Sequence, residues 1–134
     1  MVNEQIVALF ELEGAQRVEV GNTVMATTYL DSCCLIIAWY ENGAIYAQHC
    51  QDAYYINACN LPTDNRIIQA VYITAKKDGE QESHIRELNI QLNPEMAVYY
   101  SHRTKSKDVI PNVILQDERN YVLNKKEDYE MIEL

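Results

Sequence analysis

The chain has 134 residues, of which 48% are hydrophobic, so it can bury one good core and we expect a single domain over residues 1–134. Its 20 acidic and 11 basic residues give a net charge of -9, which argues against binding to nucleic acids or anionic membranes. Four cysteines without a signal peptide fit a reducing compartment, and the longest apolar run, residues 33–40, is too short to span a bilayer. We therefore expect a cytoplasmic protein, in a bacterium or, for a delivered effector, in its host.

The first half of the chain is expected to form short β-strands separated by turns. β-Like runs lie at residues 6–12, 17–20 and 23–30, and we expect them to form a meander. Residues 33–40 are apolar on both faces, which predicts a buried central strand. Glu41-Asn42-Gly43 and the apolar residues that follow predict a β-hairpin that ends near His49.

The second half adds one helix and the closing strands, so the predicted fold is α+β with a mostly antiparallel, β-sandwich-like sheet. Apolar residues recur at helical spacing after Pro62-Thr63-Asp64 and before Gly79, which predicts one main amphipathic helix at about residues 63–77. A strand ending in an Asp78-Gly79 hairpin is the competing interpretation, because the segment is rich in isoleucine, valine and tyrosine. Further strands are expected at residues 88–92, 96–100, 113–115 and 121–123, before a tail at 125–134 that is a short helix or frayed.

The hairpin decides which cysteine shares a sheet face with His49. If Asn42-Gly43 forms a two-residue turn, His49 lies on the face of Cys34. If the loop has three residues, with Gly43 in the left-handed conformation, His49 lies on the face of Cys33. Both turns suit the sequence. It therefore predicts a histidine close to one of two adjacent cysteines, a candidate base and nucleophile, without deciding between them.

These residues carry a resemblance to a known family. Thr27, Leu30, Ser32, Cys33 and His49 resemble the Thr-x-Leu-Gly-Ser-Cys stretch and downstream histidine of the chemotaxis receptor glutamine deamidases. The Leu-x-x-Cys core is also similar to that of the catalytic domains of cytotoxic necrotizing factors and the Burkholderia lethal factor, which share that fold. The resemblance implies that Cys33 is the nucleophile, His49 the base and Thr27 a third member of the site.

The activity that this resemblance implies is that of a cysteine-dependent protein glutamine deamidase, acting as a bacterial effector or as a small relative of the receptor enzymes. Such a hydrolase converts a glutamine side chain of a target protein to glutamate through a thioester, without a cofactor. Backbone N–H groups around Ser32 and Cys34 would stabilise the oxyanion. An amine that replaced water would give a transglutaminase side activity. The partner implied is a protein with an exposed glutamine.

Each of these features also has a structural interpretation. Buried cysteines pack as small hydrophobes, a strand histidine can bond a backbone carbonyl, and threonine suits a strand. A metal site is not expected, because adjacent strand cysteines point to opposite faces and no Cys-x-x-Cys pair is present. The ten tyrosines suit either cross-strand packing or a protein-binding surface. The second function class is a non-enzymatic acidic binding domain, such as an immunity or inhibitor protein.

Overall fold

The computed structural model describes residues 5–11, 13–28, 30, 33–50, 58–75, 79–103 and 110–134. They build two β-sheets and the helix α2 (Gly79–Leu92). The larger sheet has the strand order β10 (Tyr129–Ile132), β7 (Met96–His102), β6 (Ile67–Thr74), β4 (Cys34–Tyr40), β5 (Ile45–Cys50) and β2 (Gln16–Val18). The smaller sheet has the order β1 (Ile6–Leu9), β3 (Thr23–Ala26), β8 (Asn112–Leu115) and β9 (Tyr121–Leu123). The predicted α+β class is therefore confirmed, and most of the strand pairs are antiparallel.

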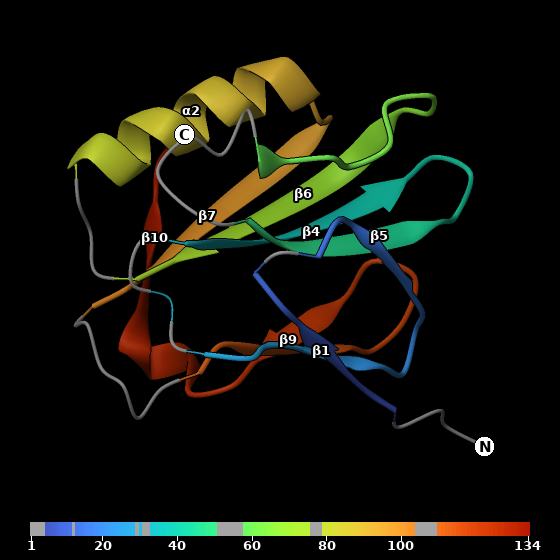
Figure 1. The fold of residues 1–134 in the computed structure, drawn as a ribbon, viewed down its shortest axis with the longest axis horizontal. Helices are drawn as coiled ribbons and strands as arrows, with labels where there is room; N and C mark the ends of the chain where they lie inside the picture. Colours follow the sequence, from blue (N-terminus) through green and yellow to red (C-terminus); the bar gives the residue numbers. More distant parts are fainter. Residues whose placement is uncertain are drawn as a thin grey trace.

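The larger sheet is the middle of three layers, as Figure 1 shows, with α2 over one face and the smaller sheet against the other. Every residue of β4 is buried, because β5 and β6 flank it and both of its faces are covered. Its odd-numbered residues from Leu35 to Trp39 lie in the apolar layer between the sheets. Its even-numbered residues from Cys34 to Tyr40 lie in the layer beneath α2. The prediction of a buried central strand is thus confirmed.

The turn between β4 and β5 settles the register that the sequence left open. Gly43 has a φ of 90°, and Tyr40 donates its N–H to the carbonyl of Ala44 at 2.8 Å, which makes a three-residue loop. Leu35 therefore lies opposite His49. Because side chains alternate along a strand, His49 shares its face with Cys33.

The predicted helix at residues 63–77 is wrong, since Ile67–Thr74 forms the strand β6, and the helix follows it as α2. β6 is buried on both faces, so its sequence lacks the period-two alternation of a half-exposed strand and resembles a buried helix segment. The strand expected at residues 88–92 is the end of α2. Leu88 is buried there, but Ile90 is 76% exposed. The apolar residue at every second position therefore resembled a strand pattern, although Ile90 does not pack in the core.

Both ends of the chain also depart from expectation. β1 and β3 pair in parallel and β2 joins the edge of the other sheet, so the N-terminal strands do not form a meander. Residues 125–134 are not frayed, because they contain the strand β10, which pairs with β7 at the edge of the larger sheet. The helix in this segment is the short 3-10 helix Lys126–Asp128. The strands expected at 96–100, 113–115 and 121–123 are confirmed within β7, β8 and β9.

Most of the described tyrosines pack inside the protein rather than on a surface. The buried ones are Tyr40, Tyr72, Tyr99, Tyr100 and Tyr129. Several of their hydroxyl groups are hydrogen-bonded: Tyr72 donates to Asn89 of α2 at 2.8 Å, and the Tyr99 hydroxyl lies 2.8 Å from that of Thr74 on the neighbouring strand. Cross-strand packing accounts for these residues.

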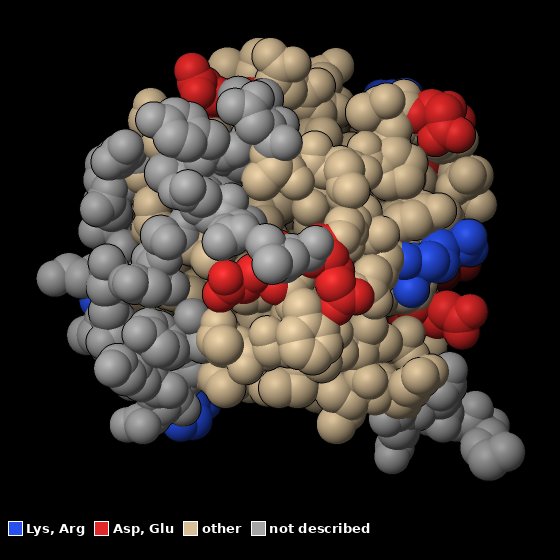
Figure 2. Space-filling model, viewed as in Figure 1, with Lys and Arg blue, Asp and Glu red and all other residues tan. Residues whose placement is uncertain are grey.

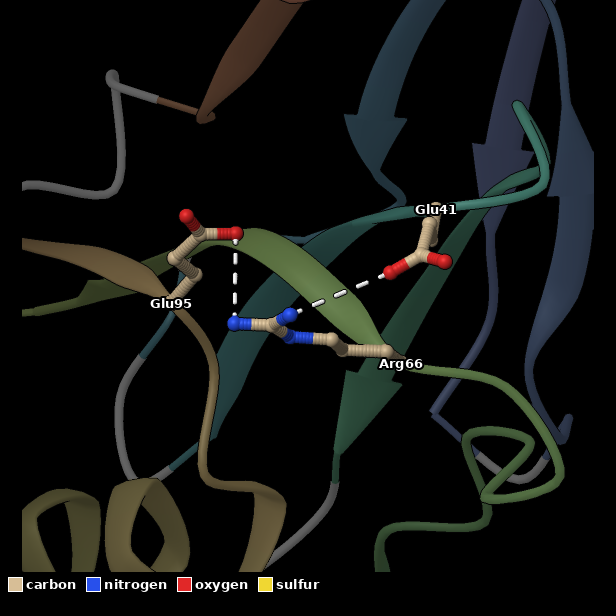
Figure 3. A network of polar contacts seen from close by, with 3 residues as sticks. All are labelled: Glu41, Arg66 and Glu95. Atoms are coloured by element: carbon tan, nitrogen blue, oxygen red, sulfur yellow. Dashed lines mark ion pairs between the residues drawn. The ribbon is translucent and has the colours of Figure 1, made fainter.

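Among the residues that the structure describes, no aspartate, glutamate, lysine or arginine is buried. On the face drawn in Figure 2, the acidic side chains are scattered over several separate positions. The described lysines and arginines on this face do not form a continuous patch. Figure 3 shows Arg66 between Glu41 and Glu95, with nitrogen to oxygen distances of 3.9 and 3.5 Å. All three side chains are more than half exposed, so each pair contributes at most about 1 kcal/mol.

Candidate functional site

The start of β4, the end of β5 and the turn after β1 bring three reactive side chains together. The sulfur of Cys33, a ring nitrogen of His49 and a carboxylate oxygen of Glu11 all lie within 4.8 Å of one another. Cys33 is 6% exposed, His49 is 1% exposed and Glu11 is partly buried. The structure thus brings together two of the residues predicted from the sequence and adds an acidic one.

His49 is held in one orientation by the end of β1. Its Nδ1 lies 3.1 Å from the carbonyl oxygen of Leu9, and a carbonyl can only accept, so Nδ1 carries the hydrogen. The other ring nitrogen, Nε2, is buried and has no hydrogen-bond partner among the residues that the structure describes. The lone pair of a neutral imidazole is therefore on Nε2, where it can take a proton.

Thr27 supports this arrangement through its backbone. Its N–H donates to the same carbonyl of Leu9 at 3.2 Å, so one oxygen accepts from both Thr27 and His49. The partly exposed Thr27 lies just beyond the end of β3, next to β1. This contact comes from the backbone of Thr27 and does not involve its side chain, so a catalytic role for the hydroxyl stays a prediction.

Cys34 is separated from the histidine by the sheet itself. Its side chain is fully buried beneath α2, and its sulfur is 3.6 Å from the carbonyl oxygen of Leu35. Burial raises the pKa of the Cys34 thiol well above its usual value, so it is a poor nucleophile. Ser32, expected to share in the oxyanion support, lies outside the described residues.

A second pair of thiols lies near the end of β5. Cys50 donates a hydrogen bond to Cys59, which raises the pKa of Cys50 and lowers that of Cys59. Gln48 ties the two segments together, since its amide donates to the carbonyl of Ala58 at 2.9 Å and accepts from the N–H of Asn60 at 3.0 Å. These cysteines face away from His49, so they are a feature separate from the candidate site.

Glu11 is the member that sequence reasoning missed. It lies 22 residues before Cys33 and 38 before His49, which matches no local motif. The only signal was an acidic residue at the end of an apolar run. Contact with the other two depends on the crossing of β1 against β5, which a spacing argument cannot supply. A hollow of about 450 Å³ near the β4–β5 turn, lined by Trp39 and Arg119 among others, includes none of these three residues.

Comparisons with known proteins assign no family. No protein-family model matches the chain, and no curated protein matches it. Among the described residues, no helix has the length and apolarity needed to cross a membrane. The geometry of Cys33, His49 and Glu11, and the motif resemblance of the segment from Thr27 to His49, are therefore the observations from which a function can be proposed.

Proposed function

We propose that this protein is a cysteine-dependent protein glutamine deamidase, with Cys33 as the nucleophile and His49 as the base. The observation that carries the proposal is the buried Nε2 of His49, which lacks a partner among the described residues while Nδ1–H is fixed on the carbonyl of Leu9. Burying an unpaired polar atom costs about 1–3 kcal/mol. A ring nitrogen of His49 and the sulfur of Cys33 lie within 4.8 Å of one another, so a small side-chain movement would let Nε2 exchange a proton with the thiol.

The reaction uses the two side chains in sequence. Nε2 of His49 takes the proton of the Cys33 thiol, and the thiolate attacks the carboxamide carbon of a glutamine side chain. The imidazolium then returns that proton to the departing nitrogen, so ammonia leaves and a thioester to Cys33 remains. Water, deprotonated by the same nitrogen, hydrolyses the thioester to glutamate and restores the thiol. A primary amine that attacks in place of water gives the transglutaminase product.

Two further observations favour a glutamine of a protein as the substrate. The run from Thr27 to Cys33 with His49 downstream resembles deamidases of protein glutamines, as described above. The net charge of -9 favours targets whose glutamine lies among basic residues. A cytoplasmic target, in the bacterium or in a host that receives the protein as an effector, belongs to the same proposal.

The alkylation rate of each cysteine against pH tests the proposal without a known target. Iodoacetamide carries the same carboxamide group as a glutamine side chain, and mass spectrometry assigns each labelled cysteine. We expect Cys33 to react fastest, with a midpoint below the ordinary thiol value of about 8.5. His49→Gln should slow it at least about 10-fold.

Cys34 is the matched control, because it is adjacent in sequence, is buried on the opposite face and should label slowly in both proteins. The second assay measures ammonia release from peptides with one glutamine flanked by lysines or by glutamates, with Cys33→Ser as the blank. If Cys33 labels no faster than Cys34 and His49→Gln changes nothing, the deamidase assignment is wrong. The acidic binding domain then becomes the better assignment.

A further inference from the structure

We propose that Glu11, Cys33 and His49 also bind one Zn²⁺ ion, and that the ion inhibits the site. A thiolate, an imidazole and a carboxylate are the three ligand types that zinc takes in proteins. Their donor atoms lie within 4.8 Å of one another. The coordination itself does not depend on the deamidase activity, whereas the inhibition rests on it.

The three donor atoms lie slightly farther apart than the ligands of a bound zinc ion. With metal to ligand distances near 2.0–2.3 Å, donor atoms of a tetrahedral zinc site lie about 3.3–3.8 Å apart. Since the three donors lie within 4.8 Å of one another, they must draw together by at most about 1–1.5 Å. Glu11 has a long side chain at a turn after β1 and is only partly buried, so rotation of this side chain can bring its carboxylate closer to the other two donor atoms.

The surroundings of His49 are an independent observation that points to a ligand. A zinc-binding histidine nearly always donates its other ring N–H to a carbonyl or carboxylate, which fixes the ring and its tautomer. Here Nδ1–H donates to the carbonyl of Leu9, which also accepts a hydrogen bond from the backbone N–H of Thr27. The remaining nitrogen, Nε2, is buried in a residue that is 1% exposed and lacks a partner among the described residues.

Three protein ligands leave a fourth position open for water. Binding exchanges the thiol proton of Cys33 for the metal, so one proton is released per ion. The bound ion occupies both the sulfur and Nε2, the two atoms that the deamidase chemistry needs. Zinc should therefore stop the enzyme by competing for these atoms, and a chelator should restore it.

Cobalt is the probe, because Co²⁺ reports its own ligands by absorption. The full chain, freed of metal with a chelator, is titrated with Co²⁺ and then with Zn²⁺. We expect one equivalent of Co²⁺ to give a thiolate charge-transfer band and the visible bands of four-coordination, and Zn²⁺ to remove them. Cys33→Ser should abolish the charge-transfer band, and Glu11→Gln should weaken binding at least about 10-fold.

Two matched variants control for the fold. Cys34→Ala removes the neighbouring buried thiol, and Glu13→Gln removes a nearby exposed carboxylate, so neither should change the titration. If Cys33→Ser does not fold, zinc protection replaces it: Zn²⁺ should slow the alkylation of Cys33 in the wild type and leave Cys59 unchanged. A wild type without the charge-transfer band, or a band that survives Cys33→Ser, would overturn the metal site.

The two proposals fail separately. Fast alkylation of Cys33 that depends on His49, together with the absence of a cobalt band, would support the deamidase proposal and refute the metal site. A cobalt band that requires Cys33, together with slow alkylation of Cys33 in the metal-free protein, would support the metal site and refute the role of Cys33 as a nucleophile.

Discussion

Replacing His49 by leucine should leave the protein as stable as the wild type or more stable. Leucine is close to histidine in size and fits the apolar layer between the sheets, where its opposite neighbour is Leu35. The change removes the hydrogen bond from Nδ1 to Leu9, worth about 0.5–1.5 kcal/mol. The Leu9 carbonyl keeps the N–H of Thr27, so no acceptor is left unpaired.

The same substitution removes the buried Nε2, whose desolvation costs about 1–3 kcal/mol. The balance puts the free energy of unfolding between about 0.5 kcal/mol below and about 2.5 kcal/mol above the wild-type value. At the same time Cys33 should lose its fast alkylation. A more stable but unreactive variant is the signature of a residue kept for activity rather than for the fold.

Urea unfolding measures the first quantity. With a slope of about 1–3 kcal/mol per molar, a change of 1 kcal/mol moves the midpoint by about 0.3–1 M. Leu35→Ala is the control, because deleting this fully buried side chain should cost about 2–5 kcal/mol in the same layer. A loss of more than about 2 kcal/mol in His49→Leu would refute the reasoning, since Nε2 would then stabilise the fold.

Two further predictions follow from shifted pKa values. At about pH 7.5, a maleimide should label Cys59 faster than Cys50, because their hydrogen bond lowers the pKa of Cys59 and raises that of Cys50. Equal rates, or an unchanged Cys59 rate in Cys50→Ala, would contradict this. Burial lowers the pKa of His102, so the unfolded chain binds its proton more readily and stability is lost as pH falls below about 6.5. His102→Phe should therefore flatten the fall in the urea midpoint between about pH 7.5 and 5.5, whereas curves that stay parallel would argue against it.

The hairpin shows how far local sequence reasoning reaches. The apolar run at residues 33–40 and the Asn42-Gly43 turn were enough to place Cys33 or Cys34 beside His49. The choice between them required the φ of Gly43, because both turn types suit the same three residues. A shift of one residue would have turned His49 to the other face of the sheet.

The strand β6 shows where such reasoning fails. Ile67–Thr74 is apolar on both faces, so its pattern has no period of two, and the helix α2 is only weakly amphipathic. The strand of the competing interpretation is confirmed, but its hairpin is wrong, because Gly79 begins α2 and the next strand, β7, pairs with β6 in parallel. Pairing of β6 with β4 and β7 decided the outcome, since burial on two faces overrides local propensity.

The sequence by itself determined the α+β class, the buried central strand and the pairing of a cysteine with His49, because these depend on local patterns of apolar residues and turns. Only the tertiary structure decided that Cys33 is that cysteine, that Leu9 orients the imidazole, and that Glu11 completes the group. The first fact follows from the three-residue turn between β4 and β5, and the other two depend on how β1 packs against the end of β5. A contact between strands so far apart in the chain leaves no periodic signal in the sequence.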